Sequence, residues 1–274
     1  MSYGWISRGR RVLGAAALTL GCCGALSAET IIYSNDPAPG DFFTSTEVAP
    51  DGAAQALSTP GWYYANVRQD GTVGINTTFA KDGNGSVYFD TTSGAGKADV
   101  LYVPGGSLGG TLNDLKTFGY DWLRTDGSTN PGTQAPSLRL ILSGTGGLRT
   151  LVFEPYYTYY QPDPVPTGHW VSSDAVDGGD ALFWQTGDPN QTTHDLTYWQ
   201  GLYGDYSVVG LSFGVGSGWS DHFTGAVDNV RIGFNGADAT VYNFEVVPEP
   251  SSVAMGLIAG AAGLAAAARR RRSK

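Results

Sequence analysis

Short runs of β-forming residues, each ended by turn-forming residues, fill the chain from Glu29 to Val246. The runs are rich in Val, Ile, Thr, Tyr, Phe and Trp, and many of the chain's 40 glycines and 14 prolines stand between them. This alternation is typical of an all-β domain. It predicts strands at Thr30–Ser34, Trp62–Val67, Val73–Phe79, Ser86–Asp90, Ala98–Val103, Thr117–Arg124, Ser137–Ser143, Thr150–Pro155, Ala181–Gln185, Val208–Val215, Val227–Phe234 and Thr240–Val246.

The number of runs predicts one domain made of two sheets. About a dozen strands favour a two-sheet antiparallel β-sandwich, a jelly roll, over a small barrel. Asn235-Gly236, between two apolar runs, is the strongest hairpin signal. Only Thr192–Leu202 has helical spacing of apolar residues, preceded by threonine caps. The first and last strands are expected to pair, which would place the C-terminal end of the domain beside its N-terminus.

The N-terminal segment, residues 1–28, has the three parts of a secretory signal peptide. A basic stretch at 8–11 precedes the apolar stretch Val12–Ala25, and Leu26-Ser27-Ala28 offers small residues for cleavage. We therefore expect export through the Sec translocon and cleavage by signal peptidase near Glu29. A twin-arginine signal and a lipoprotein signal at Cys22 are the weaker alternatives.

Cysteine and charge set limits on the exported domain, residues 29–246. Both cysteines, Cys22 and Cys23, lie in the signal peptide, so the domain has no disulfide and no thiolate metal site. Three of the 16 basic residues lie in the signal peptide and five in the C-terminal tail, which leaves eight against 25 acidic residues. Such a surface repels nucleic acid and acidic polysaccharide, and it suits divalent cations or neutral glycans.

The last residues of the chain, 247–274, form a second export-related segment. Pro248, Glu249 and Pro250 end the last strand, because proline cannot continue a sheet ladder. The uncharged run 252–268 would span about 25 Å as a helix, close to the thickness of a hydrocarbon core. A basic cluster follows that would stop transfer and keep the C-terminus cytoplasmic, formed by Arg269, Arg270, Arg271 and Arg272.

These three parts, in this order, closely resemble the PEP-CTERM sorting signal of Gram-negative bacteria. The resemblance implies that the membrane protease-transpeptidase exosortase recognises Pro248, Glu249 and Pro250. It also implies an inner-membrane-anchored precursor whose ectodomain is then displayed at the cell surface or released. An ordinary single-pass anchor is the alternative.

Two further stretches resemble the closing strands of laminin-type and galactose-binding-like jelly rolls. They are Gly214–Trp219 and Phe223–Val230, the second with the ending Phe-Thr-Gly-Ala-Val-Asp-Asn-Val. Tyr120-Asp121-Trp122 and 136–140 are similar to central strands of such domains. This resemblance implies a fold and no activity, because folds of this kind carry many functions.

Catalytic patterns are weak in this sequence. The three histidines are widely spaced, and Ser217 lacks the glycine spacing of a hydrolase nucleophile elbow. Glu154, after an apolar strand, is the one carboxylate we would consider as a catalytic acid, and a glycosidase needs a second one. We therefore predict a protein that is not an enzyme and requires no cofactor. Trp122, Trp184 and Trp219 are expected in the core.

Two loops are candidates for a structural Ca²⁺. The loop 174–180 carries Asp174, Asp177 and Asp180 around glycines, and a second loop carries Asp82 and Asn84. Carboxylate and amide oxygens are the ligands that Ca²⁺ prefers. Ordinary Asx-turns are the alternative for both loops.

Four tyrosines in five residues form the main aromatic cluster. If the segment is an extended strand, Tyr157 and Tyr159 face one side and Tyr156 and Tyr160 the other. One pair would pack in the core, while the other could stack on sugar rings.

These observations lead to one predicted function and two alternatives. We predict an exported, exosortase-sorted extracellular or cell-surface protein with a structural role in a polysaccharide-associated matrix. The first alternative is a glycan-binding module for neutral extracellular polysaccharide, and the less favoured one is a polysaccharide-degrading enzyme. Nucleic acid is not expected as a partner.

Overall fold

The computed structural model describes residues 28–176, 180–249 and 258. Several predicted features lie outside these residues: the signal peptide up to residue 27, Asp177, Pro250, the apolar run 252–268 apart from Ile258, and Arg269, Arg270, Arg271 and Arg272. Within the described residues, no helix combines the length and the apolar character needed to cross a membrane.

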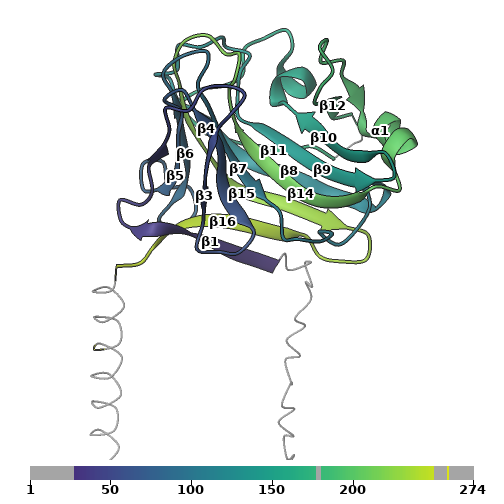
Figure 1. Cartoon of the computed structure of the whole chain (residues 1–274), viewed down its shortest axis with the longest axis horizontal. Helices are drawn as coiled ribbons and strands as arrows, with labels where there is room; N and C mark the ends of the chain where they lie inside the picture. The colour runs from purple at the N-terminus through teal and green to yellow at the C-terminus, as the bar shows by residue number, and fades with distance from the viewer. Residues whose placement is uncertain (1–27, 177–179, 250–257, 259–274) are drawn as a thin grey trace, which may run out of the picture.

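The described chain folds into two eight-stranded sheets with one short α-helix, which confirms the predicted all-β sandwich (Figure 1). The first sheet has the order β1 (Ala28–Pro37), β16 (Thr240–Val247), β15 (Phe223–Phe234), β6 (Ser86–Thr91), β5 (Thr72–Asn76) and β2 (Phe43–Thr44), with β8 (Leu115–Arg124) paired to β15 and β11 (Trp170–Asp174) paired to β8. The second sheet has the order β13 (His194–Asp195), β12 (Leu182–Gln185), β10 (Gly147–Phe153), β9 (Ser137–Gly144), β14 (Ser207–Val215), β7 (Lys97–Tyr102), β4 (Trp62–Arg68) and β3 (Ala53–Ala56).

Aromatic side chains fill the space between the two sheets. Trp62 of β4 contacts Phe244 of β16 at 5.3 Å between ring centroids, and Phe213 of β14 contacts the same ring at 5.4 Å. Phe89 of β6 meets Phe213 at 6.1 Å. These three contacts are edge-to-face, the arrangement that ring quadrupoles favour. Burial of such rings stabilises the domain without disulfides.

All twelve predicted strands correspond to strands of the structure, with shifts at their ends. The predicted strand from Val73 ends at Asn76 rather than at Phe79, because the Asn76 side chain accepts a hydrogen bond from the backbone N–H of Thr78 and starts a turn. Four strands were not predicted: β2, β3, β11 and β13. Three of these have two to four residues, too few to show an alternating pattern.

The predicted helix exists, but its cap differs from the prediction. α1 runs from Leu196 to Tyr203 and lies beside β12 and β10 at one edge of the second sheet (Figure 1). Asp195 caps it, because its carboxylate accepts a hydrogen bond of 2.8 Å from the Tyr198 backbone N–H. The threonine caps were therefore the wrong interpretation, since the aspartate directly before the helix occupies the N-cap position.

The Asn235-Gly236 hairpin is confirmed, since β15 and β16 pair antiparallel on either side of it. The first and last strands also pair, but in parallel, so this one pair departs from the predicted antiparallel sheets. Ala28 lies opposite Thr240, and Pro37 lies opposite Val247. The C-terminal end of the domain therefore lies at the other end of β1 from the N-terminus, and the expectation that the two ends are neighbours was wrong (Figure 1).

Candidate ligand-binding groove

The outer face of the second sheet carries polar side chains because its central strands alternate. In β9, Leu138 and Leu140 are fully buried between the sheets, while Ser137 and Arg139 face the opposite side. The same alternation in β7 turns Asp99 outward. One face of the sheet therefore builds the core, and the other presents hydrogen-bonding groups.

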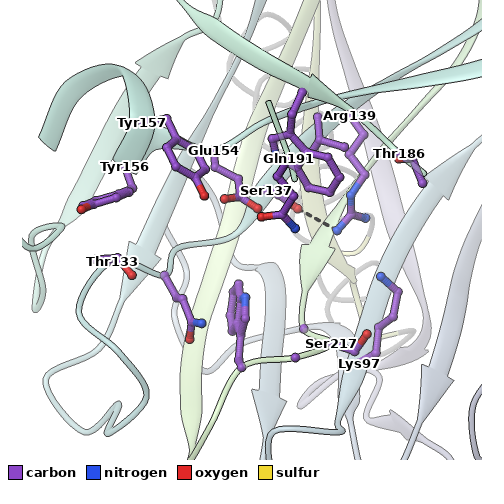
Figure 2. A pocket seen from close by; sticks show the side chains of 16 residues that line it. Lys97, Thr133, Ser137, Arg139, Glu154, Tyr156, Tyr157, Thr186, Gln191 and Ser217 are labelled. Atoms are coloured by element: carbon purple, nitrogen blue, oxygen red, sulfur yellow. Dashed lines mark hydrogen bonds between the residues drawn. The ribbon is translucent and has the colours of Figure 1, made fainter. Parts of the chain in front are cut away.

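Loops surround part of this outer face and form a hollow of about 420 Å³ (Figure 2). The strands and the residues that directly follow them supply its floor: Lys97, Ser137, Arg139, Val152 and Trp184 lie in strands, Glu154 follows β10 and Thr186 follows β12. Loops supply the walls, with Thr133, Gln134, Tyr156, Tyr157, Gln191 and 216–219. A second hollow of about 250 Å³ shares Lys97, Arg139 and Thr186 with the first and extends across β14 and β7 to Asn66 of β4. We call the two hollows together the groove.

The tyrosine segment adopts a single π-helical turn, Tyr156–Tyr160, following Pro155. The segment is therefore not the extended strand on which the division into two tyrosine pairs depended, and the four rings group differently. Tyr156 and Tyr157 line the groove. Tyr160 meets the edge of Trp122, while Tyr159 packs against Phe153 and donates a hydrogen bond to the backbone carbonyl of Asp174. A turn places neighbouring side chains on one side, which a strand cannot do.

Two of the three tryptophans predicted in the core belong to the groove. Trp122 is fully buried, as predicted. Trp184 and Trp219 are only partly buried, and both line the groove, although Trp219 also packs against the core ring of Phe223. Trp184 faces away from the core because its neighbour Phe183 on β12 occupies the core side of the strand. Figure 2 shows Tyr156 and Tyr157 across the groove from Arg139 and Lys97.

A buried carboxylate holds the cationic side of the groove in place. Asp99 is nearly fully buried and accepts a hydrogen bond of 2.7 Å from Arg139. Lys97 lies 3.2 Å from its other oxygen, and the Asn66 amide donates to that same oxygen. Although burial opposes ionisation, the two cations and these hydrogen bonds keep the pKa of Asp99 below its usual value. The carboxylate therefore stays charged and positions Arg139 and Lys97.

Glu154 is the one acidic side chain among the described residues that line the first hollow. Burial raises the pKa of its carboxyl, and Arg139 together with the Trp184 indole N–H opposes that shift. A retaining or inverting glycosidase uses two carboxyl groups roughly 5–10 Å apart. Asp99, the other carboxylate of the groove, is held in ion pairs with Arg139 and Lys97, so Glu154 is the carboxyl group placed to hydrogen-bond a ligand.

One wall of the groove is held by a buried arginine. Arg124, at the end of β8, is 3% exposed and donates to the side-chain oxygen of Asn130 at 2.5 Å. It also donates to the backbone carbonyls of Asn130 at 2.7 Å and Gln134 at 3.0 Å. Burial lowers the pKa of its guanidinium. Arg124 thus fixes the loop that carries Thr133 and Gln134 into the groove.

The residues predicted to bind Ca²⁺ make internal hydrogen bonds. The Asp174 carboxylate accepts from the Val176 backbone N–H at 2.9 Å, and Asp180 lies exposed beyond the undescribed residues 177–179. Asp82 accepts from Asn229 at 2.5 Å, whereas the Asn84 amide pairs with the backbone of Val246. Among the described residues, no three His, Cys, Asp or Glu side chains gather as a metal site. Calcium at either loop stays a prediction, and Asp177 of the first loop is not described.

Sequence reasoning found the tyrosines and Glu154 but missed most of the groove. Arg139, Lys97 and Trp184 are its main omissions. The sequence did indicate that Arg139 lies on the outer face of its strand, because it alternates with leucines that must face the core. Alternation does not show, however, whether loops turn the outer face into a hollow.

Comparisons with known proteins found similar chains among solved structures only. No protein-family model matches the chain, and no curated protein matches its sequence. Among solved structures, it is similar to a family 11 carbohydrate-binding module from Clostridium thermocellum, in complex with a β-1,3-1,4-mixed-linked tetrasaccharide. Identity is 11%, coverage is 72% of this chain and 99% of that chain, and the TM-score is 0.36.

Two further solved structures are similar to the same degree. One is the family 11 carbohydrate-binding module of the C. thermocellum cellulosomal cellulase Lic26A-Cel5E, with 11% identity, coverage of 74% and 99%, and a TM-score of 0.34. The other is a family 28 carbohydrate-binding module specific for non-crystalline cellulose, with 12% identity, coverage of 74% and 97%, and a TM-score of 0.32. All three are described as binding modules. Likeness at this level identifies neither a family nor a ligand.

Proposed function

We propose that the domain is a non-catalytic glycan-binding module and that the groove is its ligand site. The observation that carries this proposal is the composition of the first hollow. The hollow is lined by four aromatic rings, those of Tyr156, Tyr157, Trp184 and Trp219. It is also lined by the hydrogen-bonding groups of Arg139, Glu154 and two glutamines. Sites of this kind, with flat apolar surfaces beside a few placed polar groups, suit small polar ligands.

Sugars combine the two properties that this hollow can recognise. A pyranose ring presents C–H groups on its faces, which stack on tyrosine and tryptophan, and hydroxyls around its rim, which need hydrogen-bond partners. The second hollow continues the groove across β14 and β7 to β4. A groove that crosses several strands suits a run of sugars within a polysaccharide chain better than a single sugar.

We expect the double substitution Tyr157→Ala/Trp184→Ala to abolish retention of the protein on the polysaccharide it binds. Loss of one stacking partner costs about 1 kcal/mol or more, so loss of two lowers affinity by about 30-fold or more. Affinity electrophoresis in gels with and without a panel of polysaccharides measures this loss. The matched control is Tyr198→Ala, which removes a 45% exposed ring on α1 outside the groove.

Unchanged retention of a correctly folded Tyr157→Ala/Trp184→Ala variant would show that the groove is not the site. Tyr159→Ala and Tyr160→Ala should behave differently, since these rings pack on Phe153 and Trp122. They should lower the melting temperature and leave retention on polysaccharide unchanged.

The export and sorting of this module are a second proposal, supported by the C-terminal segment. β16 continues to Val247, and Pro248 and Glu249 follow directly as exposed residues. A protease would therefore meet its recognition motif immediately beyond the folded domain. Sorting by exosortase would deliver a glycan-binding domain to the surface or the extracellular matrix, where the predicted matrix role requires polysaccharide contact.

The double substitution Pro248→Ala/Pro250→Ala is expected to leave export intact and block C-terminal processing. The motif is short and proline fixes its backbone, so alanine removes both its shape and its rigidity. The mass and location of the protein in envelope fractions give the readout, with Pro189→Ala in an exposed loop as the control. Normal processing of the double variant would contradict sorting by exosortase and would favour the alternative, an ordinary single-pass membrane anchor.

A further inference from the structure

Basic side chains gather at one end of the groove, although the domain is strongly acidic. Arg68, Lys97 and Arg139 are three of the eight basic residues that lie outside the predicted signal peptide and the C-terminal tail. Lys97 and Arg139 line both hollows. Arg68 lies opposite Lys97 in the pairing of β4 with β7, and it donates a hydrogen bond of 3.1 Å to Ser217 in the groove wall.

These cations outnumber the carboxylates that could neutralise them. Asp99 pairs with both Lys97 and Arg139, and among the described residues no carboxylate lies within ion-pair distance of Arg68. Glu154 is the other acid in the groove. Burial, with a smaller contribution from repulsion by Arg139 and Arg68, lowers the pKa of the Lys97 ammonium despite the Asp99 pairing. This end of the groove therefore holds excess positive charge.

Resting on the proposed glycan-binding function, we infer that the ligand is an acidic, carboxylate-bearing polysaccharide whose acid groups lie at the Arg68, Lys97 and Arg139 end of the groove. Such a carboxylate would receive charge-assisted hydrogen bonds from Lys97 and Arg68. Its sugar ring would lie toward the rings of Tyr157 and Trp184. This differs from the preference for neutral glycans that the overall charge predicts.

Local charge decides this contact because salt screens the rest of the surface. The Debye length is about 8 Å at physiological ionic strength, so acidic residues on distant faces contribute little within the groove. Partly buried charges are screened much less. Lys97 and Arg139 line the groove and Arg68 bonds to its lining residue Ser217, whereas most of the 25 acidic residues of the chain do not line the groove.

The test compares polysaccharides that differ only in charge. The purified protein is run in affinity electrophoresis against several polyuronates, including alginate and polygalacturonate, and against the carboxyl-reduced form of each. Neutral β-glucans and single-stranded DNA complete the panel. We expect binding to at least one polyuronate to be about tenfold or more tighter than to its reduced form, and to weaken as salt is added.

Two variants connect that preference to the named side chains. Lys97→Met and Arg68→Met should each weaken polyuronate binding about tenfold. Arg68→Met should leave the melting temperature nearly unchanged, whereas Lys97→Met removes one cation from the buried Asp99 carboxylate and should lower it. The control Lys116→Met removes an exposed cation of β8, away from the groove, and should have no effect.

The outcomes separate this inference from the function on which it rests. Binding of neutral and reduced glycans as tightly as polyuronates overturns the inference and leaves glycan binding in place. Equal binding of single-stranded DNA also overturns it, because the groove would then be a general anion site. Binding to no polysaccharide overturns the glycan-binding function itself.

Discussion

Replacing Arg124 with methionine is expected to lower the free energy of unfolding by about 2–4 kcal/mol. Methionine preserves much of the side-chain volume but leaves the two buried oxygens of Asn130 and the partly buried carbonyl of Gln134 without their donor. Each buried acceptor left unsatisfied costs about 1–3 kcal/mol. Removal of a desolvated cation offsets part of this loss. Urea denaturation of the variant and of the wild-type protein measures the difference.

The same substitution should also weaken ligand retention, because the loop held by Arg124 carries Gln134 into the groove. Arg149→Met is the matched control, since Arg149 instead lies over the ring of Tyr203, outside the groove. A stable Arg124→Met variant with normal retention would show that the loop keeps its position through its backbone hydrogen bonds alone.

Replacing Asp228 with asparagine is expected to stabilise the domain at pH 8 by about 2–4 kcal/mol and by much less at pH 5. Asp228 is fully buried on β15, and its Oδ2 has no hydrogen-bond partner among the residues that the structure describes. Burial raises its pKa from 3.8 to about 7, although the Phe244 and Asn229 backbone N–H groups favour the charged form. A shift of one pKa unit corresponds to about 1.4 kcal/mol.

The direction in which stability changes with pH follows from proton binding at Asp228. Between about pH 4 and pH 7 the folded state binds more protons at Asp228 than the unfolded state, so stability falls as pH rises through this window. Asparagine removes this dependence while keeping an oxygen for the two N–H groups. Thermal denaturation at both pH values, in EDTA to exclude bound cations, measures the effect. Asp238→Asn, at an exposed position, is the control. Equal stabilisation at both pH values would contradict the assignment to Asp228.

The positions of the strands could be predicted because their signals are local. Alternating apolar residues and turn residues mark each strand within its own few residues, as in Ser137–Ser143 and at the Asn235-Gly236 hairpin. The tyrosine cluster has a weaker local signal, and its sequence left the conformation open; the segment forms a π-helical turn after Pro155.

The sequence by itself thus determined that this protein is an all-β sandwich with one short helix, and it placed most of the core. Only the tertiary structure decided that β1 and β16 run parallel, that Trp184 and Trp219 face a groove, and that Arg68 lies beside Lys97. Alternation tells which residues share one side of a strand. It cannot tell which distant strand pairs with it, or whether loops enclose the face that its polar residues share.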